Sequence, residues 1–421
     1  MVKLGYKQTE IGVIPEDWDI GMFKNVGEFF KGSGISMRDV KPTGFPCIMY
    51  GDIYVKFDTH FKKCDFKIDE NTAKRSTKAI SNDLFFTASG ETAEEIGKCV
   101  SYQGEEDIFI GGDIIAIRPK NEYNSLFLSF VQNSSLLIKQ KSALAQGHTV
   151  VHINRDSIAS LVFAYPELQE QERIAEALSD VDELISSLEK LIEKYKSIKA
   201  TCLQQMFPQK GETTPKMRLP GFTGAWEQRK LGEVGKCQSG IGFPDAEQGG
   251  KTGTPFYKVS DMNNYGNEQE MTCANNYVTD EQIVRKNWKP ITEVPAVIFA
   301  KVGAAIMLNR KRLCRFPFLL DNNTMAYKFG GQWDTNFGKT LFEKIDLTEL
   351  VQVGALPSYN ATDVENLDIK MPADINEQKA IGEFFTNLDN LITLHQRKLD
   401  KAKKIKQGMM QQLLTGKIRL L

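Results

Sequence analysis

The sequence predicts an α+β protein built as an internal pseudo-twofold repeat. Two globular domains of mainly antiparallel sheet are expected, separated by two long helices that form an antiparallel coiled coil. Three observations predict this fold: an apolar helical seam occurs twice at a constant offset, opposite charges gather at the two ends of each helix, and short β-rich runs occupy the rest of the chain at matching positions.

The two predicted helices carry the strongest pattern in the sequence. Within 170–206, apolar residues recur at alternating spacings of four and three, and the same seam returns 207 residues later. Such spacing places the seam on one face of a helix, and a helix that is otherwise polar needs a partner for that face. The seam residues are Ile174, Leu178, Val181, Ile185, Leu188 and Ile192 in the first helix, and Ile381, Phe385, Leu388, Ile392, His395 and Leu399 in the second.

Charge predicts how the two helices meet. Residues 170–183 contain six acids and one base, whereas 190–199 contain four bases and one acid, and the second helix repeats this gradient. An antiparallel pair would place each acidic end beside a basic end. In full register, His395 and Leu188 lie at the two midpoints, so we expect them to face each other. The alternative is that each long helix packs only on its own domain.

Composition narrows the class of protein. The 421 residues are 41% hydrophobic and 25% charged with a net charge of −1, so any anion-binding surface must be local. Seven cysteines without a Cys-x-x-Cys motif are typical of reduced thiols. The N-terminus lacks the apolar core of a signal peptide, and the longest apolar run, Val294–Leu308, is interrupted by Lys301 and too short to span a bilayer. We therefore expect a soluble cytoplasmic protein.

The remaining sequence divides into domains and a linker. The expected organisation is a first domain over 1–166, a helix over 167–207, a linker over 208–220, a second domain over 221–372, and a second helix with a short tail over 373–421. In the first domain, Cys47–Val55, Leu84–Thr87 and Ile108–Ile117 are predicted strands, and Ser125–Ser142 is the best helix.

The two domains share landmarks but not surfaces. Trp18, Asn154 and Pro166 of the first domain correspond to Trp226, Asn360 and Pro372 of the second, at offsets between 206 and 208. However, residues 285–315 hold eight Lys or Arg against one acid, whereas the equivalent 72–102 holds four of each sign. One frame with two different surfaces predicts two different ligands of one class.

Motifs for catalysis are missing. Gly338-Lys339-Thr340 resembles the end of a phosphate-binding loop, but Trp333 occupies the required earlier glycine position. No dinucleotide fingerprint follows a predicted strand, and the absence of any Pro-Pro dipeptide excludes the Asn/Asp-Pro-Pro-aromatic motif of amino-methyltransferases. His148 and His152 are separated by valines that favour strand or loop over a zinc-binding helix. We expect neither a catalytic site nor a bound metal or cofactor.

The combination of these motifs resembles a known family. Ile14-Pro-Glu-Asp-Trp18 and Pro220-Gly-Phe222 with Trp226 look like its two domain openings, and Glu170-Gln171 and Glu377-Gln378 look like the starts of its two helices. Over essentially the whole chain, the sequence resembles the specificity (S) subunit of type I DNA restriction–modification systems.

That resemblance implies a division of labour. Each globular domain would be a target-recognition domain that reads one half of a split, asymmetric sequence in double-stranded DNA. The helices would set the distance between the halves and dock methyltransferase (M) subunits, which methylate adenine N6 with S-adenosylmethionine. Restriction (R) subunits, using ATP and Mg, would translocate and cut, so this chain would hold no cofactor of its own.

Candidate DNA contacts are polar or cationic residues in predicted loops, since bases and phosphates need hydrogen-bond partners or positive charge. For any one of them, the alternative is a solvated turn. The candidates are Ser33, Lys56, Thr87, Ser89, Thr92, His148 and Thr149 in the first domain, and Ser239, Lys258, Lys301 and the predicted loop Asn309–Arg315 with Arg310, Lys311 and Arg312 in the second. Two other functions stay open at this point: a coiled-coil adaptor with two ligand-binding domains, and a free-standing DNA methyltransferase or nuclease, which the missing motifs disfavour.

Overall fold

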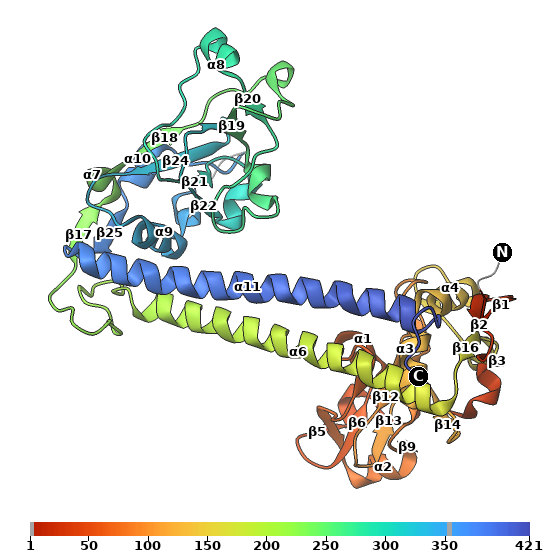
Figure 1. Cartoon of the computed structure of the whole chain (residues 1–421). Helices are drawn as coiled ribbons and strands as arrows, with labels where there is room; N and C mark the ends of the chain where they lie inside the picture. The colour runs from red at the N-terminus through yellow and green to blue at the C-terminus, as the bar shows by residue number, and fades with distance from the viewer. Residues whose placement is uncertain (1–3, 352–355) are drawn as a thin grey trace. The chain divides into compact units, whose positions relative to one another are not determined.

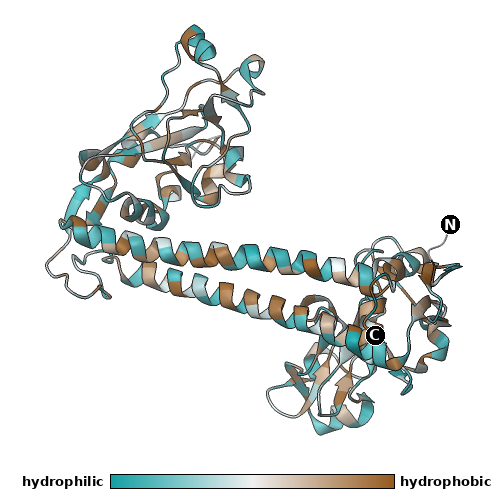
Figure 2. Ribbon diagram, in the orientation of Figure 1, coloured by the Kyte–Doolittle hydropathy of each residue, from teal (hydrophilic) through white to brown (hydrophobic). Residues whose placement is uncertain are grey.

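The computed structural model describes residues 4–351 and 356–421 (Figure 1). The chain forms two compact units, one of residues 1–188 with 398–421 and the other of residues 189–397. Two long helices, α6 (Leu168–Gln205) and α11 (Ile375–Leu413), each contribute one end to each unit. Both helices are polar with recurring hydrophobic residues, as the colouring of Figure 2 shows.

The first unit is built on two five-stranded sheets. One sheet has the order β4-β14-β10-β12-β7 and the other β5-β8-β6-β13-β9. Most neighbours are antiparallel, but β7 pairs with β12 and β6 with β13 in parallel. The elements are β1 (Tyr6–Thr9), β2 (Gly12–Pro15), β3 (Asp19–Met22), β4 (Gly27–Lys31), β5 (Val40–Lys41), β6 (Phe45–Ile48), α1 (Tyr50–Val55), β7 (His60–Phe61), β8 (Phe66–Ile68), α2 (Glu70–Arg75), β9 (Thr77–Ala79), β10 (Leu84–Thr87), β11 (Ser89–Gly90), β12 (Cys99–Tyr102), β13 (Ile108–Ile110), β14 (Ile114–Pro119), α3 (Ser125–Gln132), α4 (Ser135–Leu144), β15 (Val151–His152), α5 (Arg155–Ala159) and β16 (Val162–Tyr165), with short 3-10 turns η1 (Phe23–Asn25) and η2 (Met37–Asp39).

The second unit repeats this plan with smaller sheets. A four-stranded sheet has the order β18-β24-β21-β22, and a three-stranded sheet has the order β20-β19-β23, in which β19 and β23 are parallel. The elements are β17 (Glu227–Lys230), α7 (Leu231–Val234), β18 (Gly235–Ser239), η3 (Asp245–Glu247), β19 (Thr254–Tyr257), η4 (Val259–Asn263), β20 (Tyr277–Val278), α8 (Asp280–Lys286), β21 (Ala296–Ala300), η5 (Ala304–Leu308), β22 (Lys311–Cys314), β23 (Leu319–Leu320), β24 (Thr324–Phe329), α9 (Thr335–Lys344), η6 (Leu347–Leu350), α10 (Ala361–Glu365) and β25 (Asp368–Met371).

Three of the predicted elements are corrected. The run Ile108–Ile117 is not one strand, because β13 ends at Ile110 and β14 begins at Ile114 in the other sheet. The run Cys47–Val55 is not one strand, because β6 ends at Ile48 and α1 follows. The predicted helix Ser125–Ser142 is two helices, α3 and α4. The break lies at Asn133, whose side-chain amide binds the backbone of Cys99 in β12, and the Ser134 hydroxyl then caps α4.

The glutamine of the Glu-Gln pair at the start of each long helix binds backbone groups of the neighbouring globular part. The Gln171 amide donates to the Pro166 carbonyl at 2.9 Å and accepts from the Asn124 backbone, which precedes α3. Gln378 repeats this with Pro372 and Asp334 at 3.0 and 2.9 Å. Both glutamines are 1% exposed, so each satisfies buried backbone groups where the globular part meets the long helix.

Within each unit the long helices run antiparallel. In the second unit Tyr195 stacks on His395 with ring centroids 5.6 Å apart, and further along α6, Lys199 pairs with Asp389 on the earlier part of α11. In the first unit, Lys406 of α11 pairs with Asp182 of α6 at 2.7 Å. The predicted contact between His395 and Leu188 is therefore wrong by one heptad, because the helices are offset from full register.

The predicted seam residues are all buried or half-buried. Ile174 and Leu178 belong to the hydrophobic core of the first unit, and Ile381 and Phe385 to that of the second. The beginning of each long helix thus packs on the globular part that precedes it, which is the alternative foreseen for the helices. Each long helix therefore packs on a globular part at its beginning and pairs with the other long helix further along.

Candidate nucleic-acid interface

Two separately predicted segments of the first unit meet at one place. The short strands β11 and β15 pair, with Ser89 opposite His152, and the Ser89 hydroxyl lies 3.0 Å from His152 Nδ1. Thr92 is exposed on the loop that follows β11. The segments 87–92 and 146–149, which are far apart in the sequence, therefore adjoin.

His148 and Thr149 lie at the exposed tip of a small hairpin. Gln146 and His152 close it through two backbone hydrogen bonds of 3.0 and 2.8 Å. The turn depends on Gly147, whose φ is +107° and whose added Cβ would lie 2.2 Å from the Val150 carbonyl oxygen. A turn that only glycine fits presents the two polar side chains to solvent, where they are available to base edges.

Thr87 is not available in this way. Its side chain is fully buried, and its hydroxyl donates to the Tyr54 hydroxyl at 2.7 Å, which in turn donates to the Ser89 carbonyl at 3.0 Å. Burial raises the pKa of Tyr54, so it stays a hydrogen-bonding phenol. The structure therefore assigns Thr87 a supporting position beneath Ser89, and its prediction as a direct DNA contact is not supported by its placement.

Lys56 and Ser33 are also held by neighbours. The Lys56 ammonium lies 2.9 Å from a carboxylate oxygen of both Asp52 and Asp65, and its hydrogen bond to Asp65 is the main cause of its raised pKa. Its charge is thus already balanced. Ser33 is exposed, and its hydroxyl lies 3.0 Å from that of Thr77.

In the second unit, Lys301 lies directly before the place that corresponds to the junction of β11 and β15. It directly follows β21, its backbone N–H donates to Asn323, and its neighbour Val302 forms a bridge with Ser358. Lys301 is half-buried. This bridge is equivalent to the Ser89–His152 pair, so Lys301 lies directly beside the second unit's counterpart of the junction.

Ser239 and Lys258 lie at the ends of strands. Ser239 is the exposed last residue of β18. Lys258 follows β19, and its ammonium donates to the Gln248 side chain at 2.5 Å and lies 5.5 Å from the centre of the Phe243 ring. Both positions are compatible with a polar ligand.

The basic stretch 285–315 is not an uncompensated loop, which corrects the sequence-based expectation. Lys311–Cys314 forms strand β22 in the sheet. Glu247 pairs with Arg285 and Lys286, and Glu270 accepts two hydrogen bonds of 2.9 Å from Arg315. Both acids lie outside the stretch that was counted, and they pair with three of its eight bases, Arg285, Lys286 and Arg315.

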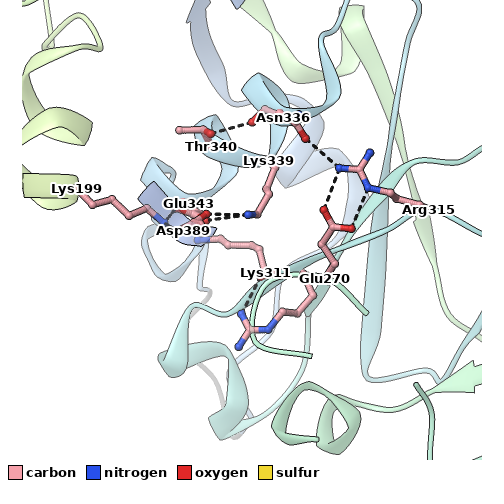
Figure 3. A network of polar contacts seen from close by, with 10 residues as sticks. Lys199, Glu270, Lys311, Arg315, Asn336, Lys339, Thr340, Glu343 and Asp389 are labelled. Carbon is pink, nitrogen blue, oxygen red and sulfur yellow. Dashed lines mark hydrogen bonds and ion pairs between the residues drawn. The ribbon is translucent and has the colours of Figure 1, made fainter. Parts of the chain in front are cut away.

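The three central cations of this stretch, of which Figure 3 labels Lys311, also have hydrogen-bond partners. Lys311 donates to the Ile345 carbonyl at 2.5 Å, Arg312 donates to the Asn267 carbonyl at 2.6 Å, and Arg310 binds the Asn263 side chain. Burial lowers the pKa of Lys311 to about 8 and also lowers that of Arg312. These side chains fasten β22 to the surrounding loops, a position that makes them poor candidates for phosphate binding.

Sequence inspection missed a repeated motif outside the helices. Lys216-Met-Arg218-Leu in the linker matches Lys417-Ile-Arg419-Leu in the C-terminal tail. In the structure, Arg218 binds Glu377 and Arg419 binds Glu170, each bidentately. The signal was three identical residues in four, but the two copies lie at unequal distances from the preceding helices, which concealed the repeat.

The long helices also expose aliphatic side chains in a repeated pattern. Leu184 and Ile405 are 52% and 46% exposed in the first unit, and Leu391 and Ile198 are both 36% exposed in the second. Leu184 and Leu391 are separated by the repeat offset, as are Ile198 and Ile405. Each unit therefore presents the same pair of positions to solvent.

The described residues hold neither a cluster of metal ligands nor a membrane-spanning helix. No group of three or more His, Cys, Asp or Glu able to hold a metal occurs in residues 4–351 and 356–421. Over the same part of the chain, no helix is both long enough and apolar enough to cross a membrane.

Comparison with known proteins identifies the family. The model of the type I restriction modification DNA specificity domain matches the chain twice, over residues 15–199 and 224–404. The putative type I restriction enzyme MjaX specificity subunit of Methanocaldococcus jannaschii is 26% identical over 99% of this chain and 97% of its own. The MjaVIII specificity subunit of the same organism is 25% identical over 97% and 94%.

Solved structures share the fold. A type I restriction–modification S subunit from M. genitalium superposes with a TM-score of 0.62 at 14% identity, covering 94% of this chain and 96% of that one. A chain from a structure of type I R-M complex assembly gives 0.54 at 14% identity, covering 96% and 99%. These matches do not favour an adaptor with unrelated ligands. The chain therefore belongs to the type I restriction modification DNA specificity family, and its role is that of a DNA-recognition subunit.

Proposed function

We propose that the chain reads a bipartite, asymmetric sequence in double-stranded DNA, with one half recognised by residues 1–166 and the other by residues 221–372. The observation that carries this proposal is the duplicated frame with different polar surfaces. The first unit presents Ser89, Thr92, His148 and Thr149 around one strand junction, whereas the second has Lys301 beside the equivalent junction. Different side chains at equivalent places suit different base sequences.

The test exchanges one domain. Residues 18–166 are replaced by the corresponding residues of a relative, and the chain is expressed with its methyltransferase subunit in a host whose genome is mapped for methylated adenine. We expect one half of the modified sequence to change and the other to stay, because each domain makes its own base contacts. Alteration of both halves would contradict the assignment of one half to each domain.

The polar hairpin provides a sharper version of this test. Replacing His148 and Thr149 with alanine removes two exposed side chains from a turn that Gly147 maintains, so the fold should persist. We expect discrimination at one or more positions of a single half-site to fall, since a lost base contact costs about 1–3 kcal/mol. Unchanged discrimination would place the base contacts of the first unit elsewhere.

The second part of the proposal concerns partner subunits. The exposed pair Leu184 and Ile405 and its repeat, Leu391 and Ile198, are suited to docking two copies of one methyltransferase subunit. Those subunits would bind S-adenosylmethionine, and restriction subunits with ATP and Mg would complete the complex in the cytoplasm. Glutamate at Leu184 and Ile405 should remove one of two bound methyltransferase subunits, measured by native mass spectrometry; retention of both would show that the pair is not a docking surface.

A further inference from the structure

The carboxylate of Glu170, at the start of α6, is 1% exposed and has three partners, one of which is the Leu420 backbone N–H at 3.3 Å. The Trp18 indole N–H donates to it at 3.3 Å, and Arg419 donates from Nε and Nη2 at 2.7 Å each. A buried carboxylate is costly without a hydrogen-bonded cation. Arg419 therefore supplies the hydrogen-bonded cation that stabilises the buried Glu170 carboxylate.

The same guanidinium reaches the beginning of the globular part. Arg419 also donates to the two carboxylate oxygens of Asp17 at 2.8 and 2.7 Å, and it lies 5.9 Å from the centre of the Trp18 ring. These hydrogen bonds to Glu170 and Asp17 raise the pKa of Arg419. One side chain from the C-terminal tail thus joins the opening of the first domain to the start of its long helix.

The tail that carries Arg419 is built into the first unit. The Gly416 carbonyl accepts a hydrogen bond of 3.0 Å from the Tyr6 hydroxyl, and the Leu420 carbonyl accepts one of 3.1 Å from Arg173. Gly416 has φ of +65°, and an added Cβ would lie 2.4 Å from Pro15. The tail therefore follows a defined path over the domain opening.

The second unit contains an equivalent clamp. Glu377 is 2% exposed, and it accepts from the Trp226 indole at 3.3 Å and from Arg218 Nε and Nη2 at 2.7 Å each. Arg218 comes from the segment after α6, just as Arg419 comes from the segment after α11. The position equivalent to Asp17 is Ala225, and Arg218 instead donates to the Gly224 carbonyl at 2.6 Å.

We propose that Arg419 and Arg218 are positioning residues for DNA reading, each fixing the orientation of one recognition domain on its long helix and each serving a different half-site. The inference rests on the proposed function, in which each domain reads one half. Neither arginine needs to touch DNA. Each acts through a buried carboxylate and an indole that connect the domain opening to the helix.

The experiment uses the complete complex of the chain with its methyltransferase subunit. Affinity is measured for a duplex with both half-sites intact, and for duplexes with either half scrambled, so that discrimination is obtained for each half separately. The variants are Arg419→Ala, Arg419→Lys and Arg218→Ala. The matched controls are Lys417→Ala and Lys216→Ala, which remove an exposed cation two residues from each arginine.

We expect Arg419→Ala to reduce discrimination for one half by roughly tenfold, the size of one lost base contact, and Arg218→Ala to do so for the other half. The two controls should leave both values unchanged. Arg419→Lys should lie between wild type and Arg419→Ala, because lysine restores the charge but not the bidentate fork. Should Arg419→Ala fail to fold, Asp17→Asn tests the same clamp, since it removes only the 61% exposed carboxylate and leaves Glu170 paired.

The results separate the possible failures. If both arginine variants weaken the same half, weaken both halves equally, or weaken neither, the positioning role is refuted. If the wild-type complex binds the scrambled duplexes as tightly as the intact one, the proposed bipartite function itself fails. A general loss of stability would lower discrimination for both half-sites together. Partial recovery in Arg419→Lys at one half-site alone would instead indicate positioning.

Discussion

Asp389→Asn is expected to destabilise the second unit selectively. Asp389 is 5% exposed on α11, and its two carboxylate oxygens lie 2.5 Å from the Lys199 ammonium and 2.8 Å from that of Lys339 (Figure 3). Burial acts to lower the pKa of Lys199, but the carboxylates of Glu343 and Asp389 outweigh it and raise that pKa. The network is therefore a balanced, mostly buried set of two lysines and two acids.

The magnitude follows from this geometry. Asparagine keeps the shape of the side chain but leaves two ammonium groups with Glu343 alone, and breaking a buried pair in this way costs about 3–5 kcal/mol. A unit of roughly 200 residues loses about 2–4 °C of melting temperature per kcal/mol. We therefore expect a fall on the order of 10 °C in the transition of the second unit.

The assay is differential scanning calorimetry of the full chain, with Asp182→Asn as the matched control. Asp182 is the repeat equivalent, paired with Lys406 and bound by the Thr59 hydroxyl at 2.7 Å in the first unit. The two variants should move different transitions. The double variant Asp389→Asn with Lys339→Met should recover part of the loss, because one stranded ammonium is removed. A shift below about 1 kcal/mol would refute the reasoning, since that is the level of a solvent-exposed pair.

Three further outcomes are expected. Lys141 is 1% exposed and donates to the Gly97 carbonyl at 2.6 Å, and burial lowers its pKa to about 8. As the pH rises, the folded state loses this proton before the unfolded state does, so the unfolding free energy of wild type relative to Lys141→Met should rise by roughly 3 kcal/mol between pH 8 and 10.5. Urea titrations that show no change in this difference would contradict the prediction. Another variant carries two matched insertions of four residues, one between Leu188 and Tyr195 and one between His395 and Ala402. Each insertion adds about 6 Å of helix, so the unread gap in the methylated DNA sequence should lengthen by one to two base pairs. Methylation retained at the original spacing would show that the helices do not set the distance between the half-sites. Lys311→Ala with Arg312→Ala should lower the melting temperature of the second unit while leaving the salt dependence of DNA binding unchanged, whereas a salt slope reduced by about one for each residue would show that both reach phosphates.

The periodic and repeated features of this protein could be predicted well from the sequence. The seam from Ile174 to Ile192 and its repeat are local patterns, and the helices α6 and α11 begin within two residues of the predicted Glu-Gln pairs. The landmark Asn154 and its counterpart Asn360 both prove to be helix N-caps, accepting from Ser157 and Asp363. Such patterns depend on backbone geometry that neighbouring residues set, and so they can be recognised without tertiary information.

The predicted DNA contacts could not be judged from the sequence, because the partners of these side chains lie far from them along the chain. Counting charges along 285–315 indicated a free basic surface, but Glu247 and Glu270, which lie outside the stretch, pair with Arg285, Lys286 and Arg315. Thr87 looked like an exposed loop hydroxyl, but it completes a buried chain of hydrogen bonds through Tyr54. Electrostatic compensation and burial follow distance in space, which sequence separation does not report.

By itself, the sequence determined that the chain is a repeat of a sheet domain and a long amphipathic helix, because periodicity and composition control those elements locally. Only the tertiary structure decided the helix register, in which His395 stacks on Tyr195, and the closing of each domain by an arginine from beyond the other helix. Arg419 and Glu170 are 249 residues apart in the sequence, and folding brings the guanidinium and the buried carboxylate together.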